Sequence, residues 1–249
     1  MFKKTVKIFC FLLFVFAAEP VRSLVEPRGT VLDFKGSVNI RQEETWEEAN
    51  QYQPVYETNI IKTSADSVAE IMFDDETVIR FEEGTEAEIK IKEGVPEVSV
   101  KEGRITSSVV PGEEVAFFVS SPLAIIGVRG TEFTVNHGIN GTDVAVFRGN
   151  VEVEDTTAKP KKINVRAGKQ SFVYKGKNPS GPVGLSPEHK KYRKTVLKKF
   201  IKRTLENRKN RNNILVKRMD IIKQENKKII NDLRKRNEEL KEQIKKQTR

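Results

Sequence analysis

The sequence is poor in the side chains that build disulfides, metal centres and thiol-based active sites. Its 249 residues include one cysteine and two histidines. Because the cysteine, Cys10, lies inside an N-terminal apolar run, a chain without this run would have neither a disulfide nor a thiol nucleophile. His137 and His189 lie far apart in the sequence, and neither has the spacing of a metal site or a catalytic triad. We therefore expect no metal and no cofactor.

Motifs of common enzyme classes are absent as well. The sequence contains neither a G-x-x-x-x-G-K-S/T phosphate-binding loop nor a G-x-S-x-G nucleophile elbow. Its 35 acidic residues are numerous, but their spacing singles out no catalytic pair. We therefore expect no catalytic residues and a protein that is not an enzyme.

Long hydrophobic runs are also scarce. The longest run, Ile8–Ala18, has 11 residues, follows three lysines and precedes small residues up to Ser23. This order is typical of a secretory signal peptide. An uncleaved anchor is the alternative, but such a run spans about 16 Å of helix, roughly half of a bilayer core. We expect a signal peptide over residues 1–23 and no transmembrane span in the mature chain.

The net charge of +10 is unevenly distributed along the chain. Residues 1–23 contain 4 Lys or Arg and 1 Asp or Glu. Residues 24–185 contain 18 Lys or Arg and 26 Asp or Glu, and residues 186–249 contain 23 Lys or Arg and 8 Asp or Glu. The three segments therefore carry net charges of +3, −8 and +15. An acidic body is followed by a basic tail, and the two require separate interpretation.

Residues 24–175 have the pattern of many short β-strands. Apolar residues alternate with polar ones in pairs such as Ile89/Ile91 and Val144/Val146, which indicates strands with one buried face. No helical pattern interrupts them. Glycine-centred signals separate the alternations, and we expect turns at Gly84, Gly94, Gly103, Gly149 and Gly168. The pattern predicts a mainly β body, built as a sandwich, a barrel or a short solenoid.

Three blocks in this body resemble a known family. They are NIIKTSADSVAEIMFDDETVIRF (59–81), FVSSPLAIIGVRGTEFTV (118–135) and DVAVFRGNVEV (143–153), and the VRGT string in the second is the most distinctive. In this order the blocks resemble the FecR domain family, named after a bacterial iron-citrate signalling regulator, over residues 29–153. The resemblance implies an all-β, extracytoplasmic, non-enzymatic module.

In the transmembrane regulators of this family, the module relays a signal to a sigma factor. The present sequence shows neither a cytoplasmic segment before its hydrophobic run nor a good transmembrane helix. The resemblance therefore implies a stand-alone exported module, in the periplasm or on the surface of a bacterium, and the sigma-factor role does not carry over.

Arg129, Gly130, Thr131 and Phe133 of the VRGT block are candidate positions for the fold or for a partner. Arg129 could contact a ligand, or its guanidinium could satisfy carbonyls or Glu132 within the fold. The flanking glycines favour the second interpretation, because they indicate an unusual backbone or a close approach. Thr131 and Phe133 alternate as strand residues, so we expect them to be core and hydrogen-bonding residues.

The acidic run at residues 74–76 has two interpretations. Three adjacent carboxylates could suggest a calcium site, but they lack the spaced ligands of a calcium loop. The run falls between two strand patterns, where a hairpin turn belongs. We expect a solvated turn.

The tail begins after a Gly- and Pro-rich linker at residues 176–186. Ser186, Pro187 and Glu188 form a helix start, with an N-cap, a proline at the first position and an acid in the first turn. No Gly or Pro follows, so we expect a basic helical tail over residues 187–248. Residues 206–213 contain no apolar side chain and predict a possible break.

A candidate assembly seam runs through the second half of the tail. Its residues follow each other at spacings of 4, 3, 4, 3 and 4: Leu215, Met219, Ile222, Asn226, Ile229 and Leu233. This is a heptad pattern, in which a polar residue such as Asn226 can set register and oligomeric state. Arg236 interrupts it before Leu240. The seam predicts self-association or a partner helix, and docking of an amphipathic helix on its own β body is the alternative.

The positive charge of the tail is compatible with several roles and partners. It could solvate an exposed helix, attract the acidic body, or bind anionic lipid, lipopolysaccharide phosphates or wall polymer. Nucleic acid is disfavoured, because the chain is predicted to be exported and residues 206–249 contain no aromatic side chains. We expect a non-enzymatic envelope module that assembles with an envelope protein or with itself through its tail. Adsorption to anionic lipid or wall polymer is the alternative.

Overall fold

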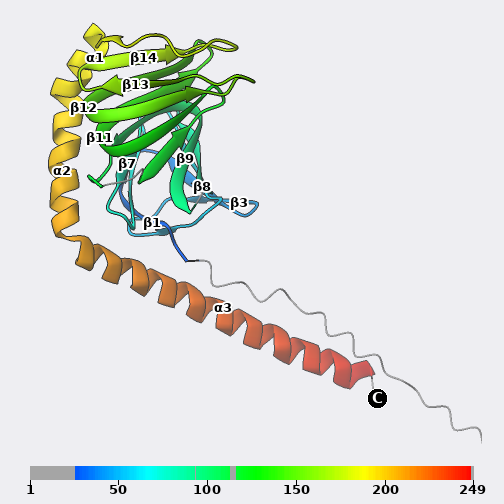
Figure 1. The fold of residues 1–249 in the computed structure, drawn as a ribbon. Coiled ribbons are helices and arrows are strands. Elements are labelled where there is room, and N and C mark those ends of the chain that lie inside the picture. The colour runs from blue at the N-terminus through cyan, green and yellow to red at the C-terminus, as the bar shows by residue number, and fades with distance from the viewer. Residues whose placement is uncertain (1–25, 93, 113–115, 248–249) are drawn as a thin grey trace, which may run out of the picture.

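The computed structural model describes residues 26–92, 94–112 and 116–247 as a mainly β body followed by long helices (Figure 1). The predicted signal peptide lies outside the described residues. The prediction of a mainly β protein with a long C-terminal helix is confirmed. None of the described helices is long and apolar enough to cross a membrane.

The strands follow the alternating segments of the sequence. They are β1 (Gly29–Lys35), β2 (Val38–Gln42), β3 (Thr45–Glu48), β4 (Pro54–Val55), β5 (Ile60–Thr63), β6 (Val68–Phe73), β7 (Val78–Phe81), β8 (Glu86–Lys92), β9 (Val95–Ser108), β10 (Phe117–Ser120), β11 (Ala124–Gly138), β12 (Gly141–Asp155), β13 (Lys162–Arg166), β14 (Lys169–Val173) and β15 (Val183–Gly184).

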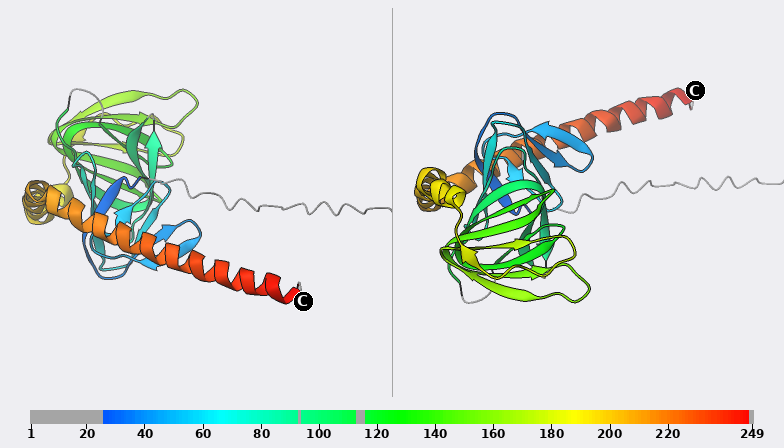
Figure 2. Two further views of the ribbon diagram at one scale, coloured as in Figure 1. Left: turned by 90° about the horizontal axis from the view of Figure 1, so that it is seen from below. Right: turned by 90° about the horizontal axis from the view of Figure 1, so that it is seen from above.

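Hydrogen bonding joins these strands into one open mixed sheet. Its main path is β15-β14-β12-β11-β10-β9-β7-β6-β1-β4, and β2, β3, β5, β8 and β13 branch from it. β10 runs parallel to β9, and the other pairings among the described strands are antiparallel. The expected sandwich or short solenoid is not what forms, because the long strands β9, β11 and β12 each pair with several neighbours and link the two ends of the body. Figure 2 shows the resulting curvature.

Two of the expected glycine turns are wrong. Gly103 lies inside β9 and Gly149 lies inside β12. Both have positive φ angles, of 91° and 81°; Gly149 lies at the register shift between β11 and β12, and Gly103 lies directly beside the shift between β8 and β9. They are therefore residues of β-bulges, which use the same left-handed backbone as a turn but bend a strand without ending it. Gly84 and Gly168 do lie between strands, as expected.

The main core fills the concave side of this sheet. Fully buried aromatic side chains anchor it, and Phe73 packs edge to face on Phe117 with ring centroids 5.1 Å apart. The core continues through valines and isoleucines from both ends of the sheet. One cluster therefore supports all of the long strands.

The tail consists of α1 (Pro187–Tyr192), a π-helical turn η1 (Arg193–Leu197), α2 (Lys198–Lys209) and α3 (Arg211–Gln247). α2 ends at Lys209, and its C-cap residue Asn210 leaves the helical conformation, with φ and ψ angles of −93° and 11°. This interruption lies inside residues 206–213. α2 runs along the side of the sheet, whereas α3 turns away and projects beyond the strands (Figures 1 and 2).

The segment before α1 is packed on the body. β15 pairs with β14, and Ser180 N donates to Phe172 O at 2.8 Å. Leu185 is buried in a second apolar cluster. Residues 176–186 therefore hold the start of the helices close to the sheet.

Candidate interaction site

The helices dock on the outer face of the sheet through a second apolar cluster. Phe200 is fully buried, and Leu197 and Ile214 are 3% and 6% exposed. They pack on side chains from several strands: Leu32, Met72, Val78, Ala145 and Phe147. Burial of these side chains stabilises the docked state by about 1.5–3 kcal/mol each. The body therefore holds α1, α2 and the first turns of α3 as one unit.

Ser186 and Pro187 begin α1 as the sequence predicts. Ser186 Oγ accepts a hydrogen bond from His189 N at 3.2 Å, which caps the helix. The same geometry directs the His189 ring into the body, where it is buried against β12 and β14. The helix start thus also fixes a titratable side chain.

His189 lies beside a buried carboxyl. His189 Nε2 is 3.3 Å from Asp143 Oδ2, and His189 Nδ1 is 3.2 Å from Gln170 Oε1. Burial raises the pKa of the Asp143 carboxyl to about 6, and burial followed by Arg104 lowers the pKa of His189. In both groups burial therefore disfavours the charged form, the carboxylate of Asp143 and the imidazolium of His189.

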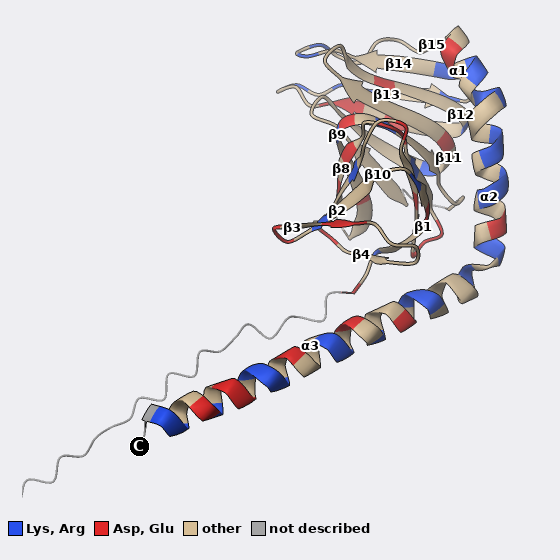
Figure 3. Ribbon diagram, turned by 180° about the vertical axis from the view of Figure 1, so that it is seen from behind, with Lys and Arg blue, Asp and Glu red and all other residues tan. Residues whose placement is uncertain are grey.

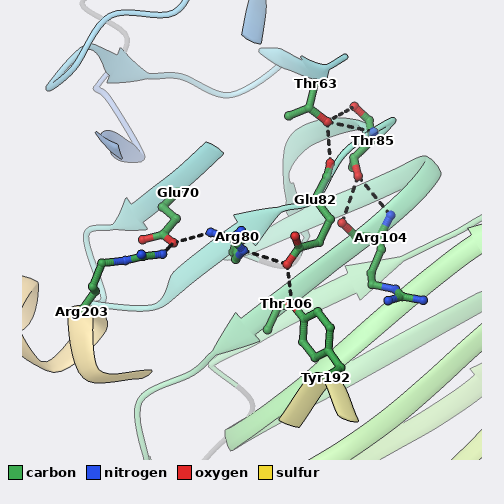
Figure 4. A network of polar contacts seen from close by, with 9 residues as sticks. All are labelled: Thr63, Glu70, Arg80, Glu82, Thr85, Arg104, Thr106, Tyr192 and Arg203. Atoms are coloured by element: carbon green, nitrogen blue, oxygen red, sulfur yellow. Dashed lines mark hydrogen bonds and ion pairs between the residues drawn. The ribbon is translucent and has the colours of Figure 1, made fainter. Parts of the chain in front are cut away.

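A buried polar network lies beneath α1 and α2 (Figure 4). Glu70, 3% exposed, accepts from Arg80 Nη1 at 2.9 Å and also from Arg203 of α2. Arg80 Nε donates to Glu82 at 2.8 Å. Arginine and glutamate therefore alternate from the sheet to the helix, and their charges compensate each other, from the buried Glu70 to Arg203, which is 44% exposed.

Tyr192 closes the network at α1. Its hydroxyl donates to Glu82 and accepts from Thr106 Oγ1 at 2.6 Å. Burial raises the pKa of Tyr192, and the neighbouring Glu82 raises it further. For Arg80, burial acts to lower the pKa, but Glu82 and Glu70 outweigh it, so the pKa of Arg80 is raised. Tyr192 is therefore a neutral donor and Arg80 a permanent cation, a state suited to holding the helix in place.

A threonine cluster fixes the backbone around Glu82. Thr63 Oγ1 donates to Glu82 O at 2.6 Å and accepts from Thr85 N at 2.9 Å. Thr85 Oγ1 donates to Arg104 O at 3.0 Å, as Figure 4 shows. The turn that presents Glu82 to α1 is therefore rigid.

A cavity of about 600 Å³ opens beside this network. Its lining includes the cations Lys35, Arg80 and Arg104 and the carboxylates Asp66, Glu82, Glu83 and Glu188. The charges are mixed, and Arg104 is already paired with Glu188 at 2.5 Å. The cavity therefore does not select a ligand of one sign. No group of three or more His, Cys, Asp or Glu in the described part of the chain could hold a metal.

The acidic turn at residues 74–76 receives arginines from the tail. Arg218 Nη1 is 2.7 Å from Asp74 Oδ1, and Arg211 Nε is 3.6 Å from Glu76 Oε1. Arg208 Nε donates to Glu76 O at 3.0 Å. The acidic run forms a turn that is partly solvated, since the side chains of Asp74 and Glu76 are 46% and 40% exposed, and this turn also attaches the helices. Figure 3 shows the Lys and Arg residues along α2 and α3 and the acidic segments of the body.

The VRGT residues form a bulge in β11. Gly130 has a φ of 58°, and an added Cβ would lie 2.9 Å from Pro111 Cα. Thr131 Oγ1 lies 2.8 Å from both Arg129 O and Asn150 O and donates its one proton to either, and Phe133 is fully buried. On one side of the bulge β11 pairs with β10, and on the other with β9. The block therefore divides β11 between two partners, while the Arg129 side chain is exposed.

The candidate assembly seam is mostly exposed. Leu215 and Ile222 are half-buried near the body, Asn226 is exposed, and Met219, Ile229 and Leu233 are 53%, 38% and 53% exposed. The body instead contacts another face of α3, through Ile214 and Arg218. The interaction of the tail with the body thus leaves the seam largely uncovered.

Part of the β body matches a known protein family. Residues 59–152 match the FecR protein family model. The resemblance expected from the three sequence blocks is confirmed. The FecR match begins just before β5 and ends within β12, so β1 to β4 and all of the helices lie outside it. FecR-type proteins are regulatory rather than catalytic, which is consistent with a protein that is not an enzyme.

The fold of this chain has a distant similarity to solved structures. Two crystal structures of a candidate anti-sigma factor from Parabacteroides distasonis ATCC 8503 are similar to this chain, with identities of 20% and 19% and TM-scores of 0.43 and 0.45. The similarity covers 52% and 55% of this chain and 61% and 64% of those chains. The chain thus matches less than two thirds of their length. No curated protein matches the chain.

Proposed function

We propose that this protein is a non-enzymatic, exported interaction module of the bacterial envelope. In this proposal the FecR-like body positions α3 as an arm that docks on a protein partner. The observation that carries it is the exposed apolar seam of a helix whose base is held by the body. An apolar helix face without a partner is a typical recognition surface.

The helix base is well suited to this role. Phe200 is fully buried, Arg203 joins the Glu70–Arg80 network, and Arg218 contacts Asp74. These contacts fix the direction in which α3 leaves the body, and a pre-oriented arm loses less entropy on binding than a free one.

The test is site-specific photocrosslinking in the native envelope. A photoreactive residue at Leu233, on the seam, should capture one defined envelope protein or a second copy of the chain. The same probe at Asn231 is the matched control, since Asn231 is exposed in the same turn but lies on the opposite face. Equal capture at both positions, or none at Leu233, contradicts the proposal.

Adsorption to anionic lipid or wall polymer is the second candidate. It is favoured by the 23 Lys and Arg against 8 Asp and Glu in residues 186–249. Residues 24–249 should then sediment with anionic vesicles or wall material and be released between about 50 and 500 mM salt, where screening strengthens. Binding that is insensitive to salt would exclude it.

A further inference from the structure

α3 carries a stripe of apolar and amide side chains with a defined centre. At about 100° per residue, Asn226, Leu233 and Leu240 form the central row. Ile222 and Ile229 lie on one side of this row, and Ile230 and Asn237 on the other. Leu233, Leu240 and Ile230 are 53%, 49% and 50% exposed.

The body does not cover this stripe. Ile214 and Arg218 face the body, as does Glu225, whose pKa is raised by burial and by Glu47. On a helical wheel this docked face lies roughly 90° from the central row. From residue 226 to residue 247, about 33 Å of helix extends past the docked segment.

The two flanks of the stripe carry opposite charges in the same repeat. Acids recur every seven residues on one flank, and cations recur every seven residues on the other. The acids are Glu225, at the end of the docked segment, and Asp232 and Glu239 beyond it, and the cations are Lys227, Arg234 and Lys241. Both rows lie about 100° from the central row, on opposite sides of it. Each cation is only two residues beyond an acid, so both rows occupy the same heights along the helix.

We propose that the stripe binds the same stripe of a second copy of this chain, with the two helices parallel. This inference rests on the proposed function and names its partner. In a parallel pair related by a two-fold axis along the helices, the acidic flank of one copy faces the cationic flank of the other. In an antiparallel pair, acids face acids and cations face cations, which is unfavourable. The helix is therefore self-complementary in only one direction.

The polar residues of the stripe fit the same arrangement. In a parallel pair Asn226 faces Asn226 of the other copy, and two amides can satisfy each other by hydrogen bonding. An asparagine at a central seam position fixes register in this way. Arg236 lies on the acidic side of the stripe, one turn from Asp232 and Glu239, which compensate its charge.

The first test is the mass of residues 24–249 in solution, measured by sedimentation equilibrium. We expect a dimer, and we expect Leu233→Asp to raise the dissociation constant at least about tenfold, because it places a charge in the centre of the stripe. Asn231→Asp adds the same charge to the opposite face and should leave the constant unchanged. Circular dichroism verifies that both variants retain their helix. A wild-type monomer at 100 µM would overturn the proposal.

The second test fixes the direction of the pair. Residues 24–249 contain no cysteine, so single substitutions report one contact each. Asn226→Cys and Leu240→Cys should each form a disulfide with the same position of the other copy, because a disulfide requires Cα atoms within about 7 Å. Disulfides that form only when the two variants are mixed indicate an antiparallel pair and refute the proposal.

The two proposals can fail separately. Capture of a different envelope protein at Leu233, together with a monomer in solution, overturns the second copy as partner but supports the interaction module. A dimer of this chain captured at Leu233 supports both. No capture in cells together with a monomer in solution contradicts both.

Discussion

Gly130 and Gly149 make the bulge that lets β11 and β12 change partners. Both have positive φ angles, and an added Cβ at Gly149 would lie 2.8 Å from Gly130 O. Such positions tolerate only glycine well. The VRGT string is thus explained by the needs of the backbone.

Gly130→Ala should lower the free energy of unfolding by about 1–3 kcal/mol, the cost of a left-handed backbone for a residue with a Cβ. Gly181→Ala is the control, because an added Cβ there meets no heavy atom within 4 Å. Urea unfolding of both variants measures the difference. Equal midpoints would show that the bulge can relax.

Asp143 and His189 should make stability depend on pH. Between its ordinary pKa of 3.8 and about 6, Asp143 is ionised in the unfolded chain but protonated in the folded one. The folded chain then binds more protons, so this group's contribution to stability falls as pH rises through that window. His189, with its lowered pKa, acts in the opposite sense, since its contribution is lost as pH falls below about 6.5.

Asp143→Asn removes the first effect. Relative to the wild type, its free energy of unfolding should rise by about 1–3 kcal/mol between pH 4 and pH 6 and then stay level, since one pKa unit corresponds to about 1.4 kcal/mol. Urea unfolding from pH 4.0 to 7.5 measures this difference. A difference that does not vary with pH contradicts the assignment.

α2 depends on Phe200 for its attachment. Phe200→Ala should cost about 3–5 kcal/mol, because it empties the centre of the outer cluster. Leu205→Ala on the same helix is the control, since Leu205 is 52% exposed. Hydrogen exchange of the α2 amides should quicken only in the first variant. Unchanged exchange in Phe200→Ala would refute the docking of α2.

The base of α3 depends on the acidic turn. A double-mutant cycle of Asp74→Asn and Arg218→Gln should give a coupling of about 0.2–1 kcal/mol, because Asp74 is 46% exposed and solvent screens the pair. The coupling should shrink as salt increases. Arg211→Gln with Asp74→Asn is a useful comparison, as Arg211 contacts the Asp74 carbonyl rather than its carboxylate.

The elements were predictable where one local pattern determines them. Period-two alternation marks strands such as β6 and β8, and the Ser186–Pro187 cap marks the start of α1. The bulges at Gly103 and Gly149 were not predictable, because a positive φ serves turns and bulges equally. The network of Glu70, Arg80 and Arg203 was not predicted either. It joins residues distant in sequence, and a single sequence shows no signal of such pairing.

The molecule consists of two parts: a folded body with the helices docked on it, and an extended arm formed by α3 from residue 226 onward. Removal of residues 226–249 should change the free energy of unfolding by less than about 0.5 kcal/mol, because residues 226–246 are all exposed. Small-angle scattering should show the longest dimension reduced. Removal of residues 211–249 is the comparison, and it should destabilise the body because it also removes Ile214 and Arg218. Equal effects of the two deletions would contradict this division.

The pairing of Glu70 with Arg203 spans 133 residues of sequence. A ribosome working at 5–20 residues per second needs about 7–27 s to make that length. Strands of the sheet can pair during this interval, but Leu32, Met72 and Val78 on its outer face stay uncovered until Phe200 packs on them. A chain whose sheet has formed before α2 docks therefore exposes this outer apolar surface, and exposed apolar surface of this kind makes folding intermediates prone to aggregation.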